Sequence, residues 1–461
     1  MSTSIKTAMA KKLFGTDGIR GKAGQFPLDA FTVRVIGDAL TAILEKRIGK
    51  KPQIVTGRDT RESGELIEKA LQAGISDADG GSLSAGVITT PGVAFLTRHY
   101  GLDAGIVVSA SHNPYEDNGI KIFLPTGAKA DEEIESAIEA AIHSISTSSV
   151  PADEDFYAIH LKDDRADEFQ RAYLDRIASE FASLDLTGKK IVLDCSHGAA
   201  STLAPKLFSS FGADVVTIHA QPNGRNINKD CGSLHMQKLQ DEVLKHNADL
   251  GVAFDGDADR SLFVDENGEL MDGDATLWIM ANYLNENGRL SSNKVVATVM
   301  SNIGLELALK ELGIELIRAN VGDKYVLEAL LSSGAEVGGE QSGHIIFPEI
   351  SLVGDGMMTA MLILRAMKEK DLSASATLNG FTQYPQVLVN VKVREKRPFN
   401  EVPEIAAAAA KTDKDLAGSG RLLLRYSGTE NLARVMIEGK DQNVIEKQAA
   451  ILASVIQSSL G

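Results

Sequence analysis

Short runs of β-branched residues alternate with longer segments of helical period through most of this 461-residue chain. In the first block, "QIVTGRDTR" and "AGIVVSAS" have the pattern of buried strands on either side of the helix-like segment "ESGELIEKALQAGI". A second block begins near Asp164 and contains "KKIVLDCSHGA", and a third begins at "NKVVATVMSN". Strands that alternate with helices form sheets covered by those helices. The pattern therefore predicts three α/β domains with mixed sheets flanked by helices.

The pattern changes after the helix-like segment "GDGMMTAMLILRAMKEK". "QVLVNVKV" alternates strictly between apolar and polar residues, "VPEIAAAAAKTDKDL" has a helical period, and "RLLLRYSGT" and "ARVMIEG" flank a tight loop. These segments predict a smaller C-terminal α+β domain. The expected domains are residues 1–155, 156–265, 266–375 and 376–461.

Composition limits the classes of function. The 47 Lys and Arg against 63 Asp and Glu give a formal charge of -16, which argues against nucleic-acid binding through a basic face. A few local cations can still hold an anionic substrate in a cleft. No stretch approaches about 20 apolar residues, so no membrane span is expected. The two cysteines, Cys195 and Cys231, lack metal-site spacing and are expected to be buried, reduced thiols in a cytoplasmic protein.

The segment "FDGDADR" places Asp255, Asp257 and Asp259 two residues apart, directly after the apolar run "LGVAF". Carboxylate oxygens at this spacing suit a hard divalent cation such as Mg²⁺. An EF-hand is excluded because Arg260 stands where that loop requires glycine and because a strand, not a helix, precedes it. The alternative is a solvated acidic turn, but three crowded carboxylates are costly without a cation.

The strand in "GIVVSASHNPYEDNGIKIF" ends in a turn that contains Ser111 and His112. A hydrolase elbow is excluded because the glycines of G-x-S-x-G are missing, and no Walker loop occurs in the chain. A Ser–His dyad is not expected, because neighbouring side chains of an extended chain point apart. What remains is a serine that carries a phosphoryl group beside a bound Mg²⁺, with Lys121 available for proton transfer.

Two glycine-containing loops could bind a sugar phosphate. "GGEQSGHIIF" offers Glu340, Ser342 and His344 to sugar hydroxyls, although a turn with a capped histidine would look the same. "RYSGTENLAR" offers two guanidiniums, two hydroxyls and turn amides to a phosphate monoester, and the alternative is a surface turn with solvated arginines. The side chains and glycine of this second loop are Arg425, Ser427, Gly428, Thr429 and Arg434.

Five segments occur in an order that resembles one enzyme superfamily. "FGTDGIRG", "SASHNPYEDNGIKIF", "FDGDADR", "GEQSGH" and "RYSGTE" together look like the α-D-phosphohexomutases, and the match spans nearly the whole chain. The resemblance implies three related α/β domains and a smaller fourth one around a central cleft. Within the superfamily, "GGEQSGHII", "PNGRNINKDCGSLH" and "VMIEG" look most like the members that act on glucosamine phosphates.

The resemblance also implies a role for each loop. Ser111 is expected to be the phosphoserine of the first domain, and the three aspartates of the second to bind Mg²⁺ with its phosphate. Two positions depart from the family pattern: Lys324 where arginine is frequent, and Asn431 where proline is common. The resemblance further implies that Arg260 braces the phosphoserine and that Lys121 or Arg20 transfers the proton. In the third domain, Glu340, Ser342 and His344 would contact the sugar, with Lys324 nearby. In the fourth domain, a phosphate clamp would be formed by Arg425, Ser427, Gly428, Thr429 and Arg434.

The implied reaction interconverts glucosamine 6-phosphate and glucosamine 1-phosphate through a phosphoenzyme and a sugar bisphosphate, which also serves as activator. This isomerase would be a cytoplasmic phosphoprotein that supplies UDP-N-acetylglucosamine, a cell wall precursor, and a homodimer is the assembly considered. The alternatives are a mutase for glucose or mannose phosphates, a non-catalytic sugar-phosphate-binding protein and a Mg²⁺-dependent phosphatase. A non-catalytic binder could lose Ser111 or one of the aspartates without penalty, yet all are present, and a phosphatase would be distinguished by net release of phosphate.

Overall fold

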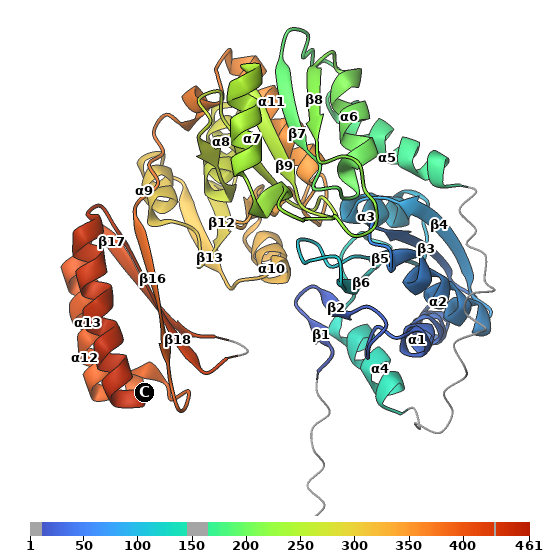
Figure 1. Ribbon diagram of the computed structural model, residues 1–461, viewed down its shortest axis with the longest axis horizontal. Coiled ribbons are helices and arrows are strands. Elements are labelled where there is room, and N and C mark those ends of the chain that lie inside the picture. The colour runs from blue at the N-terminus through green and yellow to red at the C-terminus, as the bar shows by residue number, and fades with distance from the viewer. Residues whose placement is uncertain (1–11, 145–164, 428–429) are drawn as a thin grey trace, which may run out of the picture.

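The computed structural model describes residues 12–144, 165–427 and 430–461. Four sheets follow one another along the chain, and we name domains 1 to 4 after them. Figure 1 shows these domains as an arch, with domain 1 (blue) at one foot and domain 4 (red) at the other. Met1–Ala10 and the expected linker near residue 150 lie outside the described residues.

Domain 1 contains a six-stranded sheet in the order β1-β2-β6-β5-β3-β4. β3 is parallel to β4 and β5, whereas β6 is antiparallel to β5 and β2. Successive strand residues point to opposite faces, so one apolar cluster joins the sheet to α1, α2 and α4 and another joins it to α3. The elements are β1 (Phe14–Gly15), β2 (Gly18–Lys22), α1 (Ala30–Ile48), β3 (Gln53–Arg58), α2 (Gly64–Asp77), β4 (Gly81–Val87), α3 (Thr90–His99), β5 (Ala104–Val108), β6 (Asp117–Phe123) and α4 (Glu132–His143).

Domain 2 contains a five-stranded sheet in the order β11-β10-β9-β7-β8. β7 is parallel to β8 and β9, and β10 returns antiparallel to β9. The last strand of the sheet, β11, lies beyond residue 265, where the sequence pattern placed a boundary. The elements are α5 (Ala166–Glu180), β7 (Lys190–Asp194), α6 (Ala200–Ser210), β8 (Asp214–Ile218), a 3₁₀ turn (Gly232–Leu234), α7 (Gln237–His246), β9 (Leu250–Phe254), β10 (Ser261–Val264) and β11 (Leu270–Met271).

Domain 3 contains a four-stranded sheet in the order β13-β12-β14-β15. Its longest buried helix, α11, begins after Asp355, whose side chain accepts a hydrogen bond from the N–H of Met358. α8, α9 and α11 share the cluster that contains α3, whereas α10 covers the other face. The elements are α8 (Gly273–Glu286), β12 (Lys294–Thr298), α9 (Ile303–Glu311), β13 (Glu315–Ala319), α10 (Asp323–Ser333), β14 (Gly338–Gly339), β15 (Ile345–Ile346), α11 (Gly356–Lys370) and a 3₁₀ turn (Ser375–Leu378).

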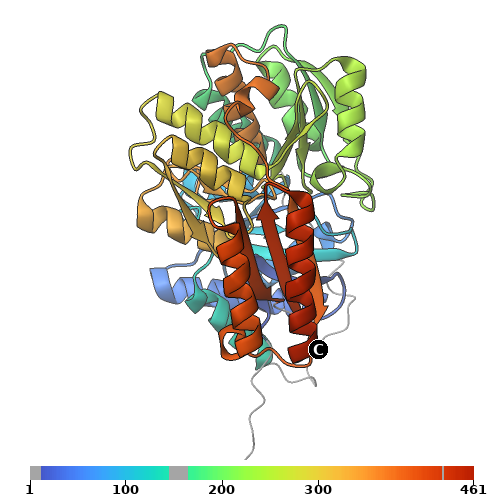
Figure 2. The same cartoon turned by 90° about the vertical axis from the view of Figure 1, so that its left-hand side faces the viewer.

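Domain 4 contains a small antiparallel sheet in the order β16-β18-β17. Figure 2 shows α12 and α13 side by side on the outer face of this sheet. The α+β domain expected from the sequence is thus confirmed. The elements are β16 (Gln386–Lys392), a 3₁₀ turn (Phe399–Glu401), α12 (Pro403–Leu416), β17 (Gly420–Tyr426), β18 (Leu432–Gly439) and α13 (Gln442–Leu460).

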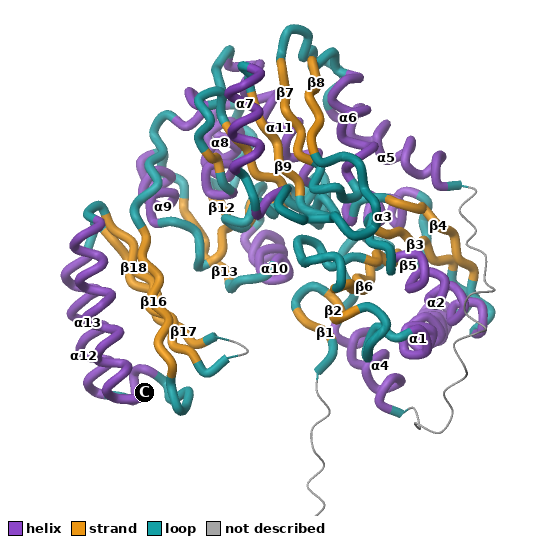
Figure 3. Tube along the Cα trace, in the orientation of Figure 1, coloured by secondary structure: helices purple, strands orange, loops and turns teal. Residues whose placement is uncertain are grey.

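One apolar cluster runs through domains 1, 2 and 3, and contains Val93 of α3, Phe169 of α5 and Met361 of α11. Domain 4 has a separate core around Ile405 and Val435. Figure 3 shows loops of the first three domains gathered at the middle of the arch. Among the described residues, no helix is both long enough and apolar enough to span a membrane. Both cysteines are free and buried, as predicted.

Candidate active site

Ser111 lies in the turn that follows β5 and is fully buried. Its Oγ donates a hydrogen bond to Asp255 Oδ2 at 2.5 Å, and its backbone N–H donates to Ser109 Oγ at 2.9 Å. The backbone of Ser111 has φ +53°, in the left-handed region that residues with a side chain rarely occupy. The hydroxyl is therefore aimed at the acidic loop by a backbone conformation that the surroundings must hold.

The acidic loop connects β9 to β10 and brings Asp255, Asp257 and Asp259 together. One carboxylate oxygen of each lies within 4.8 Å of the others, and all three side chains are buried. Burial and the charges of the other two aspartates raise the pKa of Asp255 well above its usual value. One oxygen of Asp257 and one of Asp259 have no hydrogen-bond partner within the part of the chain that the structure describes. Crowded, unsatisfied carboxylate oxygens fit a divalent cation.

Lys121 reaches the same loop from β6 and is 1% exposed. Its Nζ lies 2.8 Å from Asp257 Oδ2, 3.1 Å from Asp259 Oδ2 and 3.1 Å from Asp17 Oδ2. Burial lowers the pKa of Lys121, but these three carboxylates more than offset it and raise that pKa well above its usual value. In this arrangement Lys121 is a cation that neutralises the acidic loop.

His112 lies close to Ser111, and the prediction that their side chains point apart was wrong. His112 Nδ1 is 3.3 Å from Ser111 Oγ, because the left-handed backbone of Ser111 breaks the extended alternation. Arg260 Nη1 donates to the same nitrogen at 3.1 Å. Burial, with Arg260 and then Arg20, lowers the pKa of His112 to about 4. A neutral ring whose Nδ1 accepts from Arg260 is poorly placed to act as a base for Ser111.

A cavity of about 470 Å³ opens beside this group. Its lining comes from domain 1 through Arg20 and His112, from domain 2 through Arg260, and from domain 3 through Glu340 and His344. The predicted substrate residues Ser342 and Lys324 of domain 3 do not line it, and neither do Arg425, Ser427 and Arg434 of domain 4. The cavity agrees with the central cleft that the sequence resemblance implies.

The loop between β14 and β15 supplies the domain 3 side of the cavity. Glu340 Oε1 accepts a hydrogen bond from the N–H of Gly322 at 3.0 Å, and Ser342 lies at the exposed tip of the loop. His344 is buried, and its Nε2 accepts from the N–H of Gly354 at 3.1 Å. The proton of a neutral His344 therefore lies on Nδ1, on the side of Asp259.

Lys324 stands at the start of α10 and forms an ion pair with Glu132 of domain 1, at 3.1 Å. Burial lowers its pKa, but Glu132 more than offsets this and raises it. Lys324 thus joins domain 3 to domain 1 near the cavity, since the residue before it, Asp323, lines the cavity.

The predicted phosphate loop lies at the end of the β17–β18 hairpin. Arg425 and Arg434 occupy directly opposite positions on the two strands. Among the described residues, neither guanidinium has a carboxylate partner; Arg425 contacts Met300 Sδ at 3.7 Å, and Arg434 Nε is buried without a partner. Ser427 Oγ accepts from the N–H of Glu430 at 3.3 Å. Gly428 and Thr429 lie outside the described residues.

Several residues of the site were missed by the sequence analysis. Asp17 binds Lys121 and Lys129, and Lys129 also binds Asp323 of domain 3. Thr90, at the start of α3, donates to Asp257. Asp17 is part of the quoted segment "FGTDGIRG", which could have indicated it. Lys129 and Thr90 stand in no motif, so only the folded chain identifies them.

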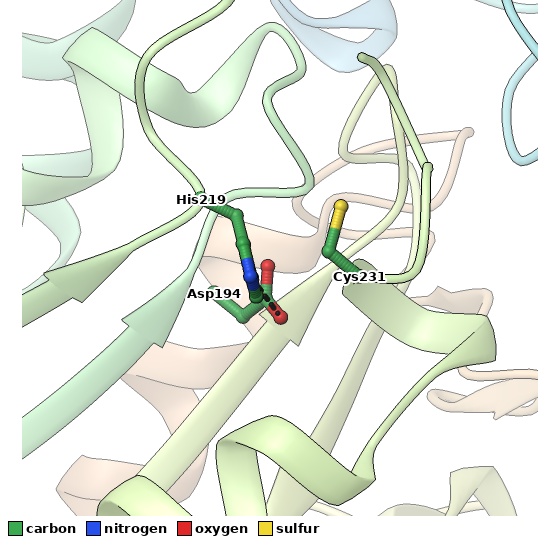
Figure 4. Close-up of side chains that lie close together, drawn as sticks. All are labelled: Asp194, His219 and Cys231. Carbon is green, nitrogen blue, oxygen red and sulfur yellow. Dashed lines mark hydrogen bonds and ion pairs between the residues drawn. The ribbon is translucent and has the colours of Figure 1, made fainter.

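A second group of metal-ligand residue types, Asp194, His219 and Cys231, lies in domain 2 (Figure 4). Asp194 Oδ2 bonds with His219 Nδ1 at 2.9 Å and accepts from the N–H of Gly232 at 3.0 Å, while Oδ1 accepts from the N–H of Ser196 at 2.9 Å. Burial and Asp194 raise the pKa of the Cys231 thiol to about 12. Both carboxylate oxygens are already satisfied, so this group is a buried structural network.

Family models for phosphoglucomutase/phosphomannomutase match the chain in order: the alpha/beta/alpha domains I, II and III at residues 11–149, 171–268 and 272–384, and the C-terminal domain at 388–455. The phosphoglucosamine mutase of Solibacter usitatus is 46% identical over 455 residues, which cover 98% of this chain and 100% of the relative. The phosphoglucosamine mutase of Deinococcus radiodurans is 44% identical over 447 residues, covering 97% and 98%.

Solved structures share the fold. A phosphoglucomutase/phosphomannomutase family protein from Burkholderia thailandensis has a TM-score of 0.76 at 24% identity, with 97% of both chains covered. The N-acetylphosphoglucosamine mutase of Aspergillus fumigatus, in complex with GlcNAc-6P and magnesium, has a TM-score of 0.66 at 19% identity, covering 97% and 96%. The chain therefore belongs to the phosphoglucomutase/phosphomannomutase family, among the phosphoglucosamine mutases, and is an enzyme of the intramolecular phosphotransferase class.

Proposed function

We propose that the chain interconverts glucosamine 6-phosphate and glucosamine 1-phosphate, with Ser111 as the phosphoryl carrier. The observation that supports this chemistry is the position of Ser111 Oγ, 2.5 Å from Asp255 Oδ2 and beside a cavity that His112 lines. Identities of 46% and 44% to phosphoglucosamine mutases support glucosamine phosphate as the substrate.

The reaction consists of two phosphoryl transfers. In the first, the bond between phosphorus and Ser111 Oγ breaks while phosphorus bonds to the free hydroxyl oxygen of the sugar phosphate, whose proton leaves. The resulting sugar bisphosphate turns over in the cavity. In the second transfer its other phosphoryl group returns to Ser111 Oγ and restores the phosphoenzyme, so no phosphate is released.

We assign the proton transfer to Lys121. Arg20 also lines the cavity, but a guanidinium stays protonated in proteins and is a poor base. With Mg²⁺ on Asp257 and Asp259, two of the three carboxylate charges that hold the proton on Lys121 would be offset, leaving that of Asp17. Arg260, which contacts His112 beside Ser111, is placed to brace the phosphoserine.

The three aspartates and the phosphate on Ser111 would hold Mg²⁺, which supplies positive charge to the transferring phosphoryl group. Asp257→Asn keeps the shape of the side chain and removes one ligand charge. We expect the Mg²⁺ concentration for half-maximal activity to rise roughly tenfold or more. Titration of activity with Mg²⁺ measures this, and an unchanged midpoint would remove Asp257 from the ligand set.

The non-reacting phosphate of the substrate binds in domain 4, on Arg425, Ser427 and Arg434 together with Gly428 and Thr429. The sugar ring lies against Glu340 and His344, with Ser342 and Lys324 reaching it when the cavity is filled. Because the sugar and the non-reacting phosphate bind to different domains, either phosphate of the bisphosphate can occupy the same clamp.

An assay of isomerisation with the 6-phosphates of glucosamine, glucose and mannose tests the substrate. We expect the highest kcat/KM for glucosamine 6-phosphate. Higher efficiency with mannose or glucose 6-phosphate would favour the broader mutase, and net release of inorganic phosphate would favour a phosphatase. A protein that binds the sugar phosphates without turnover would be a non-catalytic binder.

The proposed setting is cytoplasmic amino sugar metabolism, on the route to UDP-N-acetylglucosamine, with a sugar bisphosphate as activator. The proposed assembly is a homodimer, and light scattering coupled to gel filtration tests it by molar mass.

A further inference from the structure

A loop of domain 2, residues 219–232, reaches across to the serine turn of domain 1. Asn228 Nδ2 donates hydrogen bonds to the backbone carbonyls of Ser111, at 2.9 Å, and Asn113, at 3.0 Å. Arg61 Nη2 donates to the same two carbonyls, both at 2.9 Å. Two donors from different domains thus fix the Ser111–His112 and Asn113–Pro114 peptide groups of this turn.

These contacts act on a strained backbone. The φ of +53° at Ser111 lies in the left-handed region, which is unfavourable for a residue with a side chain. Since the backbone conformation sets the direction of Cβ, the bonds to the Ser111 carbonyl also decide where Oγ points. Loss of a donor would let the turn relax and move Oγ away from Asp255.

The loop is itself tied to one buried carboxylate. Asp194, at the end of β7, binds His219 at one end of the loop (Figure 4). It also accepts a hydrogen bond from the N–H of Gly232 at the other end. The N–H of Asn228 donates to the carbonyl of Ser196, at 2.9 Å, and Asp194 also holds the N–H of Ser196. The backbone of Asn228 is therefore held in place by a hydrogen bond to a buried residue of domain 2.

The loop also docks on domain 1 beside Arg61. The N–H of Glu62 donates to the carbonyl of Gly224 at 3.0 Å, and Arg225 Nε pairs with Glu62 at 2.7 Å. These contacts hold the loop on domain 1, and Asn228 extends from it to the serine turn. Asn228 is not among the residues that line the cavity.

We propose that Asn228 is a positioning residue that holds the phosphoserine turn from domain 2, so that the phosphoryl group on Ser111 stays aimed at the aspartates. The proposal rests on the proposed function. Because Asn228 touches neither the cavity nor the substrate, its loss should slow phosphoryl transfer and leave substrate binding largely unchanged.

Asn228→Asp tests the donor. Asparagine 228 has φ +58°, which aspartate also tolerates, so this variant keeps shape and backbone while placing a carboxylate oxygen against two carbonyl oxygens. We expect kcat to fall roughly ten- to a hundredfold and KM for glucosamine 6-phosphate to stay within about twofold. Asn228→Gly, which removes the amide and keeps the left-handed backbone free of strain, should lower kcat by about tenfold.

Asn223→Asp is the matched control. Asn223 is an exposed residue of the same loop whose Oδ1 accepts from the N–H of Arg225, and aspartate keeps that acceptor while adding the same charge. We expect wild-type kcat and KM. Thermal unfolding of all variants checks the fold, and intact mass checks the phosphate on Ser111.

Wild-type kcat in both Asn228 variants would overturn the proposal, and so would a rise in KM with unchanged kcat. If Asn228→Asp does not fold, the glycine variant decides by the same criteria. A wild-type enzyme without isomerase activity would instead refute the proposed function, so the two failures are distinguishable.

Discussion

At the scale of single residues, the site depends on groups whose charge is set by their neighbours. Lys121 is held as a cation by three carboxylates, and His112 is held neutral by burial and by the guanidiniums of Arg260 and Arg20. Ser111 Oγ donates its hydrogen bond to Asp255, at 2.5 Å. A buried hydroxyl that donates to a carboxylate of a cation-binding loop agrees with the phosphoryl carrier proposed for Ser111.

Ser111→Ala should abolish isomerisation, since alanine has no oxygen to esterify. The intact mass of the purified variant should lack the single phosphate that the wild-type enzyme carries. Its thermal stability should be close to that of the wild type, because only the contacts of one hydroxyl, with Asp255 and His112, are lost. Near-normal turnover in the variant would contradict the phosphoserine assignment.

At the scale of elements, the β17–β18 hairpin brings two arginines together, which suits the anion proposed to bind there. Arg425 and Arg434 are a directly opposed cross-strand pair, and like charges at such positions destabilise a sheet. Burial and then Arg434 lower the pKa of Arg425. A phosphate dianion between the two guanidiniums would relieve this repulsion, which explains why the hairpin retains two cations without a carboxylate partner among the described residues.

Arg425→Ala should lower kcat/KM in both reaction directions by roughly ten- to a hundredfold, because each half-reaction places a phosphate in the same clamp. The phosphate on Ser111 should remain. Lys392→Ala, which removes a charge from the exposed end of β16, is the control and should behave as the wild type. Loss of activity in one direction alone would be inconsistent with a shared clamp.

At the scale of the whole molecule, domains 1 to 3 share a core and domain 4 does not. Domain 4 joins domain 3 through polar contacts. Asn302 and Tyr384 exchange two hydrogen bonds of 2.9 Å. The carboxylate of Glu438 accepts a third from the N–H of Ile303, at 3.1 Å. Polar contacts of this kind allow one domain to move against another. We expect the hinge for such a movement at residues 372–383, directly before Tyr384.

A sugar bisphosphate should close domain 4 over the cavity, since both phosphates must be held and water kept from the phosphoserine. Small-angle X-ray scattering with and without glucose 1,6-bisphosphate should show a smaller radius of gyration in its presence. Arg425→Ala, with its clamp weakened, should close less at the same ligand concentration. An unchanged radius in the wild-type enzyme would exclude the hinge.

The junction between domains 3 and 4 should also respond to pH. Burial, with Asp272 and Glu438 nearby, raises the pKa of Asp274 to about 7, against about 3.9 in an unfolded chain. The folded protein therefore binds a proton that the unfolded chain has lost, and the stability from this group is full below about pH 4 and lost as pH rises through about 7.

Asp274→Asn removes this titration and keeps the acceptor for the N–H of Asn302, at 2.7 Å. Relative to the wild type, its thermal midpoint should rise by more at pH 8 than at pH 5. Asp175→Asn, on the exposed side of α5, should show no such difference. An equal change at both pH values would contradict a raised pKa at Asp274.

The sequence by itself determined the fold class, the acidic loop and the serine. Strand and helix periods are local, and Asp255, Asp257 and Asp259 need only one turn to converge. Tertiary structure decided what depends on distant contacts: the left-handed turn that brings His112 to Ser111, and the meeting of Lys129 with Asp323. It also decided the reach of Asn228 across two domains. Local spacing carries no information about such pairs, because the packing of separate domains sets their distance.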